Sequence, residues 1–447
     1  VAVMADLMPI LRFGDPALGR WFDRSPVSSL EVARVVTRIL DEVRAGGEEA
    51  VRANVRHFDA PGLESIWVSE EEIAEARLDD ADLAALRLAI ERIRDFHEVQ
   101  LGVVTHDYES MDPAPGWFWR TDVTDDPETG FEGQRLLPVA RAGVYVPGGR
   151  AAYPSSVLMN VIPAQVAGVT EIIVASPPAR DGRLADAVLV ACRELGITRI
   201  LKAGGAVAIG ALALGLPDFP RMDVIVGPGN VYVNEAKRQV WGGVGLDGYA
   251  GPSEVAVLVD GSVEARFSAA DLLTQVEHAP DNVGMLIATS DGAADAVLGA
   301  DEALLYEQPH EKSMRDALRD HGVVVRVESL DEAVDVLNRF APEHASLHVH
   351  DAANVAIRVV NCGYIHLGAH SPQAAGDYLA GPSHTLPTAG AARFASPVNV
   401  SMFLKVQSLG MMSASDIALL APAVTRLAEL EGFPMHGRGA SVRLPES

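Results

Sequence analysis

At 447 residues the chain is long enough to hold two or three domains, each with a core of its own. Its formal net charge of -25 argues against a nucleic-acid partner, because neutralising backbone phosphates requires clustered Lys and Arg. The longest uncharged run, residues 151–170, is interrupted by prolines and polar residues, so no membrane span is expected.

The start of the chain lacks the basic and then apolar pattern of a signal peptide. Only Cys192 and Cys362 are present, which excludes a disulfide framework and fits a reducing cytoplasm. Cys192 lies at an apolar-periodic helix position and is expected in a core. Cys362 has no base nearby in sequence, so nucleophilic cysteine catalysis is not favoured.

The first part of the chain is predicted to be helical. Residues 28–31, Ser-Ser-Leu-Glu, have the form of a capping box that opens an amphipathic run. A second helical region is predicted over 69–101, with the Asp pair at 79–80 able to restart it. Residues 105–132, which hold several Asp, Pro and Gly, are predicted as loop or short strands.

From Val139 the pattern changes to short apolar strands that alternate with helices. The predicted strands are 143–147, 171–175, 199–203 and 223–226, and the helices include 155–166, 184–195 and 235–240. This alternation indicates βαβ units and a parallel sheet, with Gly-rich turns of the kind that bind phosphates or nucleotides. No G-x-G-x-x-G fingerprint is present, so a standard dinucleotide-binding motif is not predicted.

After residues 250–254 a second α/β series begins. Its predicted strands are 255–259, 284–288, 323–327, 346–349 and 364–367, with helices at 266–278 and 330–340 and a last helix at 414–431 in a tail. The fold class is therefore α/β, with two incomplete Rossmann-like parallel-sheet domains, a small helical N-terminal segment and a C-terminal tail.

Glu343 and His344 follow a predicted helix that Pro342 would stop, so we expect them on an exposed turn. Two general acid/base side chains with different pKa values would then reach into the same space. Taken alone, however, a Pro-Glu-His sequence is more often a solvated helix end than a catalytic pair.

Gln275 and His278 are three residues apart on a predicted helix and could share a metal, or form a partly buried polar helix end. Asp377 and His384 lie in a Gly-rich loop beyond the strand at 364–367, which we expect at the carboxyl edge of a sheet. His436 reads, on its own, as a surface residue of the tail.

Several short motifs follow one another in a fixed order. They are Gly143-Val-Tyr-Val-Pro-Gly-Gly149, Gly227-Pro-Gly-Asn230, Glu235-Ala-Lys-Arg-Gln239, Ala250-Gly-Pro-Ser-Glu254, Gln275-x-x-His278, Pro342-Glu-His344, Gly376-Asp-Tyr378 and His384-x-Leu-Pro-Thr388. The ordered set resembles the histidinol dehydrogenase family, which makes histidine from histidinol with two molecules of NAD. The match runs from about Ile39 to the C-terminus.

Carried over by position, the resemblance implies one Zn2+ per subunit held by Gln275, His278, Asp377 and His436. It implies two catalytic bases: His344 takes the hydroxyl proton in the first oxidation, and Glu343 activates water in the second. It implies substrate contacts from Ser253, His384 and Glu431, besides His344 and the metal ligands, and NAD contacts from Tyr145 and Asn230.

The resemblance also implies a domain-swapped homodimer, in which the tail of one subunit completes the site of the other. The domains expected are an N-terminal segment (1–26), a discontinuous α/β domain (27–144 with 254–393), an NAD-binding α/β domain (145–253) and a dimerisation tail (394–447).

One position departs from the family pattern. The family usually carries Gln after Gly-Gly-Ala, and this chain has Val207, which cannot form a hydrogen bond to the cofactor. Two alternatives stay open: a relative that oxidises another alcohol, such as a sulfonated diol, and a binding protein without enzymatic activity. Ser253 and Glu431 favour a histidinol-like cation, because a carboxylate would repel a sulfonate.

Overall fold

The computed structural model describes residues 7–24, 29–111, 116–123, 130–148, 152–248, 251–306 and 308–445. Ser28, Gly149 and Ala250, which belong to motifs named above, lie outside these ranges. The chain divides into two compact units, a larger one of Val1–Glu98 with Ala140–Val400 and a smaller one of Val99–Val139 with Ser401–Ser447. None of the helices in the described ranges has the length and hydropathy that a bilayer span needs.

The larger unit contains a six-stranded sheet in which every pairing is parallel. Its strands in spatial order are β1 (Ile10–Arg12), β12 (Val323–Arg326), β11 (Val283–Ala288), β10 (Glu254–Val259), β13 (His344–His348) and β14 (Tyr364–Leu367). Successive side chains of a strand point to opposite faces, so Val255 and Val257 enter one core while Ala256 and Leu258 enter another. Both faces are apolar and both are covered by helices.

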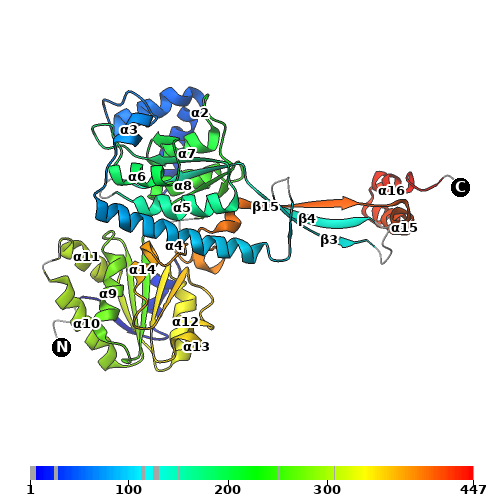
Figure 1. Cartoon of the computed structure of the whole chain (residues 1–447). Helices are drawn as coiled ribbons and strands as arrows, with labels where there is room; N and C mark the ends of the chain where they lie inside the picture. Colours follow the sequence, from blue (N-terminus) through cyan, green and yellow to red (C-terminus); the bar gives the residue numbers. More distant parts are fainter. Residues whose placement is uncertain are drawn as a thin grey trace. The chain divides into compact units, whose positions relative to one another are not determined.

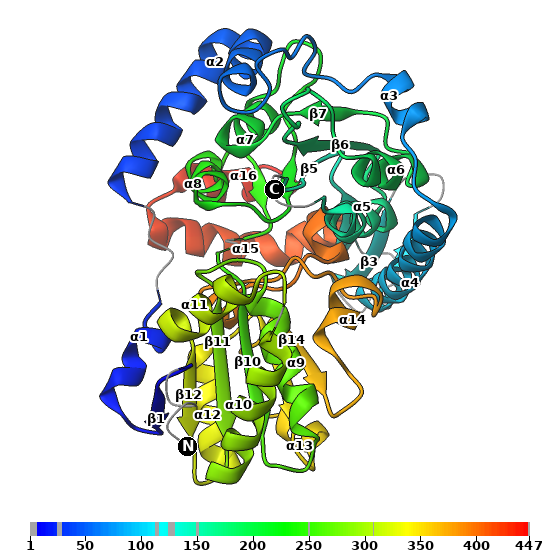
Figure 2. The same cartoon turned by 90° about the vertical axis from the view of Figure 1, so that its left-hand side faces the viewer.

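Figure 2 shows α9 and α10 over one face of this sheet. The helices of that face are α9 (Ala265–Val276), α10 (Asp291–Leu305) and α11 (Glu311–His321). The opposite face is covered by η2 (Pro16–Leu18), α1 (Gly19–Phe22), α12 (Leu330–Phe340) and α13 (Ala352–Ala356). Residues 16–22, which form η2 and α1, therefore belong to this layer.

A five-stranded parallel sheet lies in the same unit, above the six-stranded sheet in Figure 1. Its strands in spatial order are β7 (Ile200–Lys202), β6 (Glu171–Ser176), β5 (Arg141–Tyr145), β8 (Val224–Val226) and β9 (Gly245–Leu246). The helices around it are α2 (Leu30–Phe58), α3 (Glu70–Glu75), α5 (Pro154–Ala167), α6 (Asp186–Glu194), α7 (Gly205–Leu214) and α8 (Val231–Val240). Ser29 caps α2, and α2 packs on α7 and α8.

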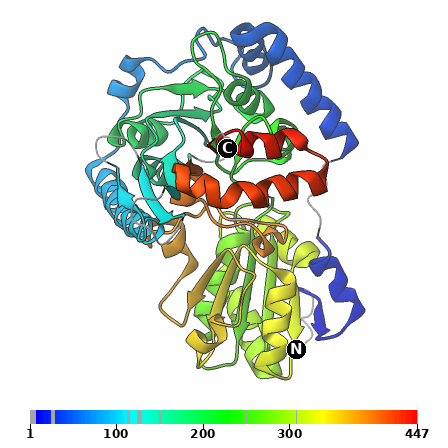
Figure 3. The same ribbon diagram turned by 90° about the vertical axis from the view of Figure 1, so that its right-hand side faces the viewer.

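The smaller unit is built on a four-stranded antiparallel sheet. Its strands in spatial order are β15 (Leu404–Met411), β4 (Phe131–Pro138), β3 (Trp117–Asp122) and β2 (Glu109–Ser110). The helices α15 (Ala414–Glu431) and α16 (Pro434–Ser441) pack side by side in this unit (Figure 3). The long helix α4 (Asp80–Val104) enters it from the larger unit.

The predicted fold class is confirmed, because two separate parallel sheets carry helices on their faces. The strands and helices of both α/β series form close to the predicted residues. The grouping differs from the expected domain bounds in more than one place. Residues 27–144 were grouped with 254–393, whereas α2 packs in the five-stranded layer and β5 is the central strand of that sheet. Residues 404–411 pair with β4, and β4 pairs with β3, so the tail shares a sheet with part of residues 105–132, the segment predicted as loop or short strands.

Candidate active site

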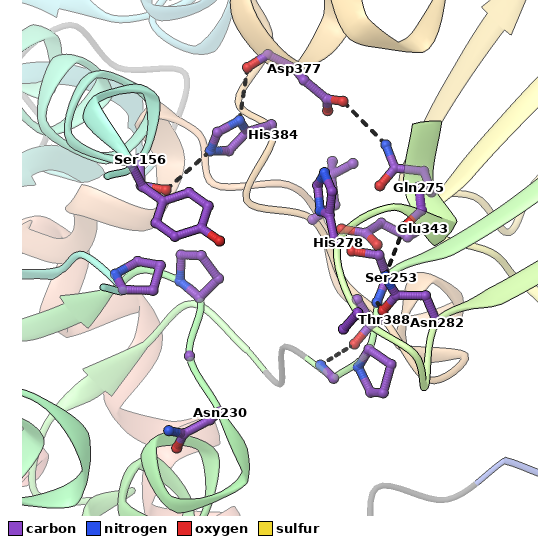
Figure 4. Close-up of a pocket in the computed structure, with 18 of the residues that line it drawn as sticks. Ser156, Asn230, Ser253, Gln275, His278, Asn282, Glu343, Asp377, His384 and Thr388 are labelled. Carbon is purple, nitrogen blue, oxygen red and sulfur yellow. Dashed lines mark hydrogen bonds between the residues drawn. The ribbon is translucent and has the colours of Figure 1, made fainter. Parts of the chain in front are cut away.

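A cavity of about 570 Å³ opens in the larger unit. It is bounded by the turns after β5 and β8, at the carboxyl edge of the five-stranded sheet, and by the residues that begin β10 and β13. Figure 4 shows side chains from both layers around it. The cavity therefore lies at the amino edge of the six-stranded sheet, whereas the sequence predicted its carboxyl edge.

Gln275 and His278 enter this cavity from the end of α9, as their spacing predicts. Asn282 holds this end in place: its Nδ2 donates to Gln275 O at 2.8 Å, and its Oδ1 accepts from Ser253 N at 3.0 Å. Since Ser253 leads directly into β10, one amide ties the helix end to the amino edge of the sheet (Figure 4).

Asp377 comes from α14 (Gln373–Tyr378), a short helix rather than the predicted loop. Its Oδ2 accepts from Gln275 Nε2 at 3.2 Å. The first residue of this helix, Gln373, is fixed by a bond from its backbone N–H to Asp271 Oδ1 at 3.3 Å and another from its Nε2 to Ser346 Oγ at 2.9 Å. Burial raises the pKa of Asp377 to about 6, so a cation in the cavity would favour its ionised form.

Glu343 and His344 both line the cavity, but they are not exposed. His344 is 1% exposed and is the first residue of β13, and Glu343 is 8% exposed. The prediction of an exposed turn was wrong because α12 ends at Phe340, with Ala341 in a left-handed conformation, and the chain turns straight into a strand between two others. The two bases are therefore held by sheet packing rather than by a turn.

Burial shifts the pKa values of the two bases in opposite directions, because it disfavours the charged form of each. It lowers the pKa of His344 well below its ordinary value, which keeps the imidazole neutral. It raises the pKa of Glu343 well above its ordinary value, and the negative charges of Glu254 and Asp377 raise it further. A backbone N–H donated by Glu254 to Glu343 Oε2 at 3.1 Å opposes this shift.

Glu254 is itself a buried acid behind the cavity, 3% exposed. Its Oε1 accepts from the Arg24 guanidinium and from Ala389 N. Burial raises the pKa of Glu254 to about 7, although the positive charge of Arg24 lowers it. Arg24 thus connects the N-terminal segment to the floor of the site. No local pattern in the sequence predicts this contact.

His384 bridges the two layers at the top of Figure 4. Its Nδ1 lies 2.8 Å from Asp377 O, and its Nε2 lies 3.5 Å from the Oγ of Ser156, a residue of α5. Burial lowers the pKa of His384 to about 4, so this imidazole is neutral as well. Ser253, on the opposite wall, also faces the cavity.

The two residues assigned to cofactor binding have different surroundings. Asn230 lines the cavity, and its Oδ1 caps α8 by accepting from Tyr232 N and Val233 N. Tyr145 does not line it: its side chain is buried, and its hydroxyl accepts from Gly205 N at 3.1 Å. Val207 is 1% exposed within the apolar core of the five-stranded layer, where an amide would need a buried partner.

The turn that carries Asn230 is rigidly held. Gly227 has φ +113°, and a Cβ there would stand 2.0 Å from Tyr145 O, so only glycine fits. Its N–H donates to Asp247 Oδ2 at 2.7 Å, and Lys237 Nζ donates to both Gly227 O and Asp247 Oδ1. The Asp247 side chain therefore braces this turn.

Glu431 and His436 belong to the smaller unit, at the end of α15 and in α16. Both side chains are exposed, and neither is among the residues that line the cavity. The sequence predicted α15 but not α16, so His436 lies on a helix rather than on an irregular tail.

The donor set in the cavity suits a zinc ion in its chemistry, with one imidazole nitrogen and amide and carboxylate oxygens from His278, Gln275 and Asp377. Within the described residues, no group of three or more His, Cys, Asp and Glu side chains is arranged around a metal position. The Gln275 amide is not one of these four residue types, and His436 belongs to the other unit. These three donors leave one position of a tetrahedral zinc ion to a further ligand.

Neither cysteine is placed for chemistry. Cys192 is fully buried in α6, as predicted, and burial raises its thiol pKa to about 12. Burial also raises the pKa of Cys362 to about 12, and its Sγ lies 3.2 Å from Tyr364 O.

The chain matches the family model described as histidinol dehydrogenase over residues 22–444. It is 44% identical over 426 residues to the histidinol dehydrogenase of Geobacter metallireducens, covering 94% of each chain. It is 41% identical over 416 residues to that of Bacillus subtilis, covering 92% of this chain and 93% of the relative. The crystal structure of histidinol dehydrogenase from Elizabethkingia anophelis matches with a TM-score of 0.88 at 31% identity, covering 98% of each chain.

These similarities span nearly the whole length of the chain and of its relatives, and the solved structure shares the fold. The chain therefore belongs to the histidinol dehydrogenase family, a family of NAD-dependent oxidoreductases of histidine biosynthesis.

Proposed function

We propose that the chain oxidises L-histidinol to L-histidine in two steps, with NAD as the oxidant and one zinc ion per subunit. Family membership supports the reaction. The observation that carries the assignment of residues is the cavity in which Glu343 and His344 lie beside Gln275, His278 and Asp377. This one cavity is lined by two bases and three metal donors.

Gln275, His278 and Asp377 would hold the zinc ion, with His436 as the further ligand. When bound, the ion would orient the imidazole and amine of the substrate, which fixes the reacting carbon in one position. The raised pKa of Asp377 supports this role, because a buried carboxylate gains from a nearby cation. Gln275 would have to turn its amide oxygen, rather than the nitrogen that now contacts Asp377, toward the ion.

His344 acts as the base of the first oxidation. Its burial keeps it neutral, so it can accept the proton of the substrate hydroxyl. The O–H bond breaks, the C=O bond of the aldehyde forms, and the carbon gives up a hydride to NAD. Ser253 and His384, on opposite walls of the cavity, hydrogen-bond the substrate during this step.

Glu343 acts as the base of the second oxidation. It takes a proton from a water molecule that adds to the aldehyde, and a second hydride then leaves to NAD. Glu343 must be ionised for this task. A cation held by Asp377 would offset the negative charges that raise its pKa. Asn230 and Tyr145 serve the cofactor, Asn230 from the wall of the cavity and Tyr145 by fixing the turn at Gly205.

The assay is turnover of purified, zinc-loaded protein with histidinol and NAD. Two NADH per histidinol support the proposal. Turnover of another alcohol alone, such as a sulfonated diol, would point to a relative with altered specificity. No turnover of any alcohol would point to a binding protein, the alternative that Val207 raised. Repeating the assay with NADP defines the cofactor.

The division of labour between the bases is tested with Glu343→Gln. This variant should still release the first NADH and lose most aldehyde oxidation, because His344 is untouched. Glu328→Gln, an exposed carboxylate remote from the cavity, is the matched control and should behave as wild type. Equal loss of both steps in Glu343→Gln would refute the assignment.

We further propose that the active form is a homodimer in which Glu431 and His436 complete the site of the partner subunit. The exposed apolar side chains of α15, Leu419, Leu427 and Leu430, support association through the smaller unit.

Subunit mixing tests this arrangement. His344→Ala and His436→Ala homodimers should each be inactive. Equal mixing after dissociation should restore about a quarter of wild-type activity, because half of the dimers then hold one intact site. If His436 serves its own subunit, the mixture stays inactive.

A further inference from the structure

A second buried imidazole lies directly behind His344. His366, on β14, places its Nε2 3.3 Å from the Nδ1 of His344. His366 is 3% exposed and does not line the cavity, so it cannot contact a bound substrate there. The other ring nitrogen of His344, Nε2, lies 3.6 Å from Asp377 Oδ1 on the cavity side.

The strand register accounts for this contact. In the parallel pair of β13 and β14, His344 is opposite Tyr364, and Ser346 is opposite His366. Residues two apart on a strand point to the same face, so the His366 ring lies beside and just beyond that of His344. The two ring planes are inclined by 26° with centroids 5.5 Å apart.

His366 has little freedom to move away. The ring of Tyr364 stacks on it with centroids 4.2 Å apart. On the side of α14, a Cβ at Gly376 would come within 2.7 Å of His366 Cε1, which leaves room for glycine alone. The position of the His366 Nε2 atom is therefore defined by packing on both sides.

A neutral imidazole carries one proton, on either Nδ1 or Nε2, and the hydrogen bond made by one nitrogen decides the state of the other. For His344 to accept a proton from a substrate in the cavity, its Nε2 must carry the lone pair, so its Nδ1 must carry the hydrogen. A hydrogen on Nδ1 points at His366 Nε2, which can accept it.

We propose that His366 is a positioning residue that holds His344 in the Nδ1–H tautomer by accepting its hydrogen bond, so that Nε2 presents its lone pair to the substrate hydroxyl. This inference rests on the proposed role of His344 as the base of the first oxidation. When Nε2 takes the hydroxyl proton and the substrate C=O forms, His344 becomes an imidazolium, and its bond to His366 becomes charge-assisted and stronger. His366 then stabilises the product of the proton transfer without touching the substrate.

The protonation state of His366 agrees with an acceptor role. Burial lowers the pKa of His366 to about 4, so the ring stays neutral near neutral pH and keeps an acceptor nitrogen.

Two substitutions separate the hydrogen bond from packing. His366→Phe keeps an aromatic ring against Tyr364 but removes the acceptor. His366→Gln keeps an acceptor oxygen near the former Nε2 position. Tyr364→Phe, which removes a hydroxyl from the neighbouring ring, is the control for general disturbance of this strand.

The kinetic test measures kcat and KM for the first NADH, with zinc content determined for each variant. His366→Phe should lower kcat by about 10- to 100-fold with KM changed by less than about threefold, as expected when a hydrogen bond that orients a catalytic His is lost. His366→Gln should recover most of kcat, and Tyr364→Phe should match wild type. Unchanged kcat in His366→Phe, or an equally low kcat in His366→Gln, would overturn the proposal.

A spectroscopic measurement decides the same question without turnover. In protein labelled with ¹⁵N-histidine, the two nitrogens of His344 report which one carries the hydrogen, and His344→Gln identifies their signals. Wild type and His366→Gln should show the Nδ1–H tautomer. A wild-type His344 with its hydrogen on Nε2 would refute the inference. If the wild-type protein fails to oxidise histidinol while His344 is the Nδ1–H tautomer, the proposed function fails and the positioning role stands.

Discussion

The buried ion pair between Arg24 and Glu254 leads to a stability prediction that depends on pH. The two side chains are only 14% and 4% exposed, and the Arg24 guanidinium also lies 4.1 Å from the ring centroid of Phe340 and donates to Phe340 O. Arg24→Leu removes the charge and keeps an apolar side chain. We expect it to destabilise the fold more at pH 8 than at pH 6.

The magnitude follows from the pKa of Glu254, which burial raises from its ordinary value of 4.5 to about 7. Since the folded state binds the proton more tightly, stability falls as pH rises from 4.5 through 7, by about 3.4 kcal/mol in all. The charge of Arg24 limits this loss. Without it the pKa of Glu254 rises further, and this destabilises the fold at pH 8 by up to about 1.4 kcal/mol, because only one unit separates a pKa of 7 from pH 8. At pH 6 the carboxyl is already protonated, so the loss comes from the contacts with Phe340 and the hydrogen bond to Glu254, on the order of 1–2 kcal/mol.

Urea unfolding at both pH values measures this difference. Arg24→Leu should lose at least about 1 kcal/mol more at pH 8 than at pH 6. The double variant Arg24→Leu with Glu254→Gln should show similar losses at both, because the titrating group is gone. Equal losses for Arg24→Leu at the two pH values would show that the pair contributes packing and not charge compensation.

Three further predictions concern the site and its support. Gly227→Ala should lower the free energy of unfolding in urea by about 1–3 kcal/mol and raise KM for NAD, since it forces a strained turn. The control Gly292→Ala, where a Cβ would meet open space on a helix, should leave both quantities unchanged. Asn282→Ala should raise KM for the substrate several-fold and lower the free energy of unfolding by about 1–3 kcal/mol, because Ser253 N and Gln275 O lose their hydrogen-bond partner. An unchanged KM would contradict this prediction. Burial lowers the pKa of His348 from 6.5 to about 4, so its neutral form stabilises the fold above pH 6.5 and that stability is lost as pH falls toward 4. His348→Gln should therefore make the free energy of unfolding depend less on pH between 6.5 and 4. An unaltered dependence would refute this prediction.

The sequence predicted regular elements well where a local pattern was strong. The helix predicted at 414–431 spans Ala414–Glu431, and the apolar strands of both α/β series lie near their predicted positions. The antiparallel pairing of β3, β4 and β15 was missed. Residues 117–122 and 131–138 have no clear alternation of their own, and their pairing depends on residues 404–411, far away in sequence.

The site was predicted in its members but not in its environment. Pro342 does follow a helix end, yet the burial of Glu343 and His344 is set by strands on either side of β13, which no local rule describes. Asn282, Asp271 and Arg24 reach the site through side-chain contacts between distant elements. In the sequence, His366 is simply one polar residue in Tyr-Ile-His-Leu. Its contact with His344 depends on the register of β13 and β14, which the sequence does not predict.

Because the cavity lies at the amino edge of the six-stranded sheet, the loops at the carboxyl edge of that sheet are separate from the residues proposed for catalysis. Of the described residues, those in the loops that follow β10, β11, β12 and β13 do not line the cavity. These loops can therefore change length or sequence under separate constraints from the catalytic groups. Residues 261–263, at the first of them, offer a position where a peptide tag or reporter domain could be inserted into the working enzyme.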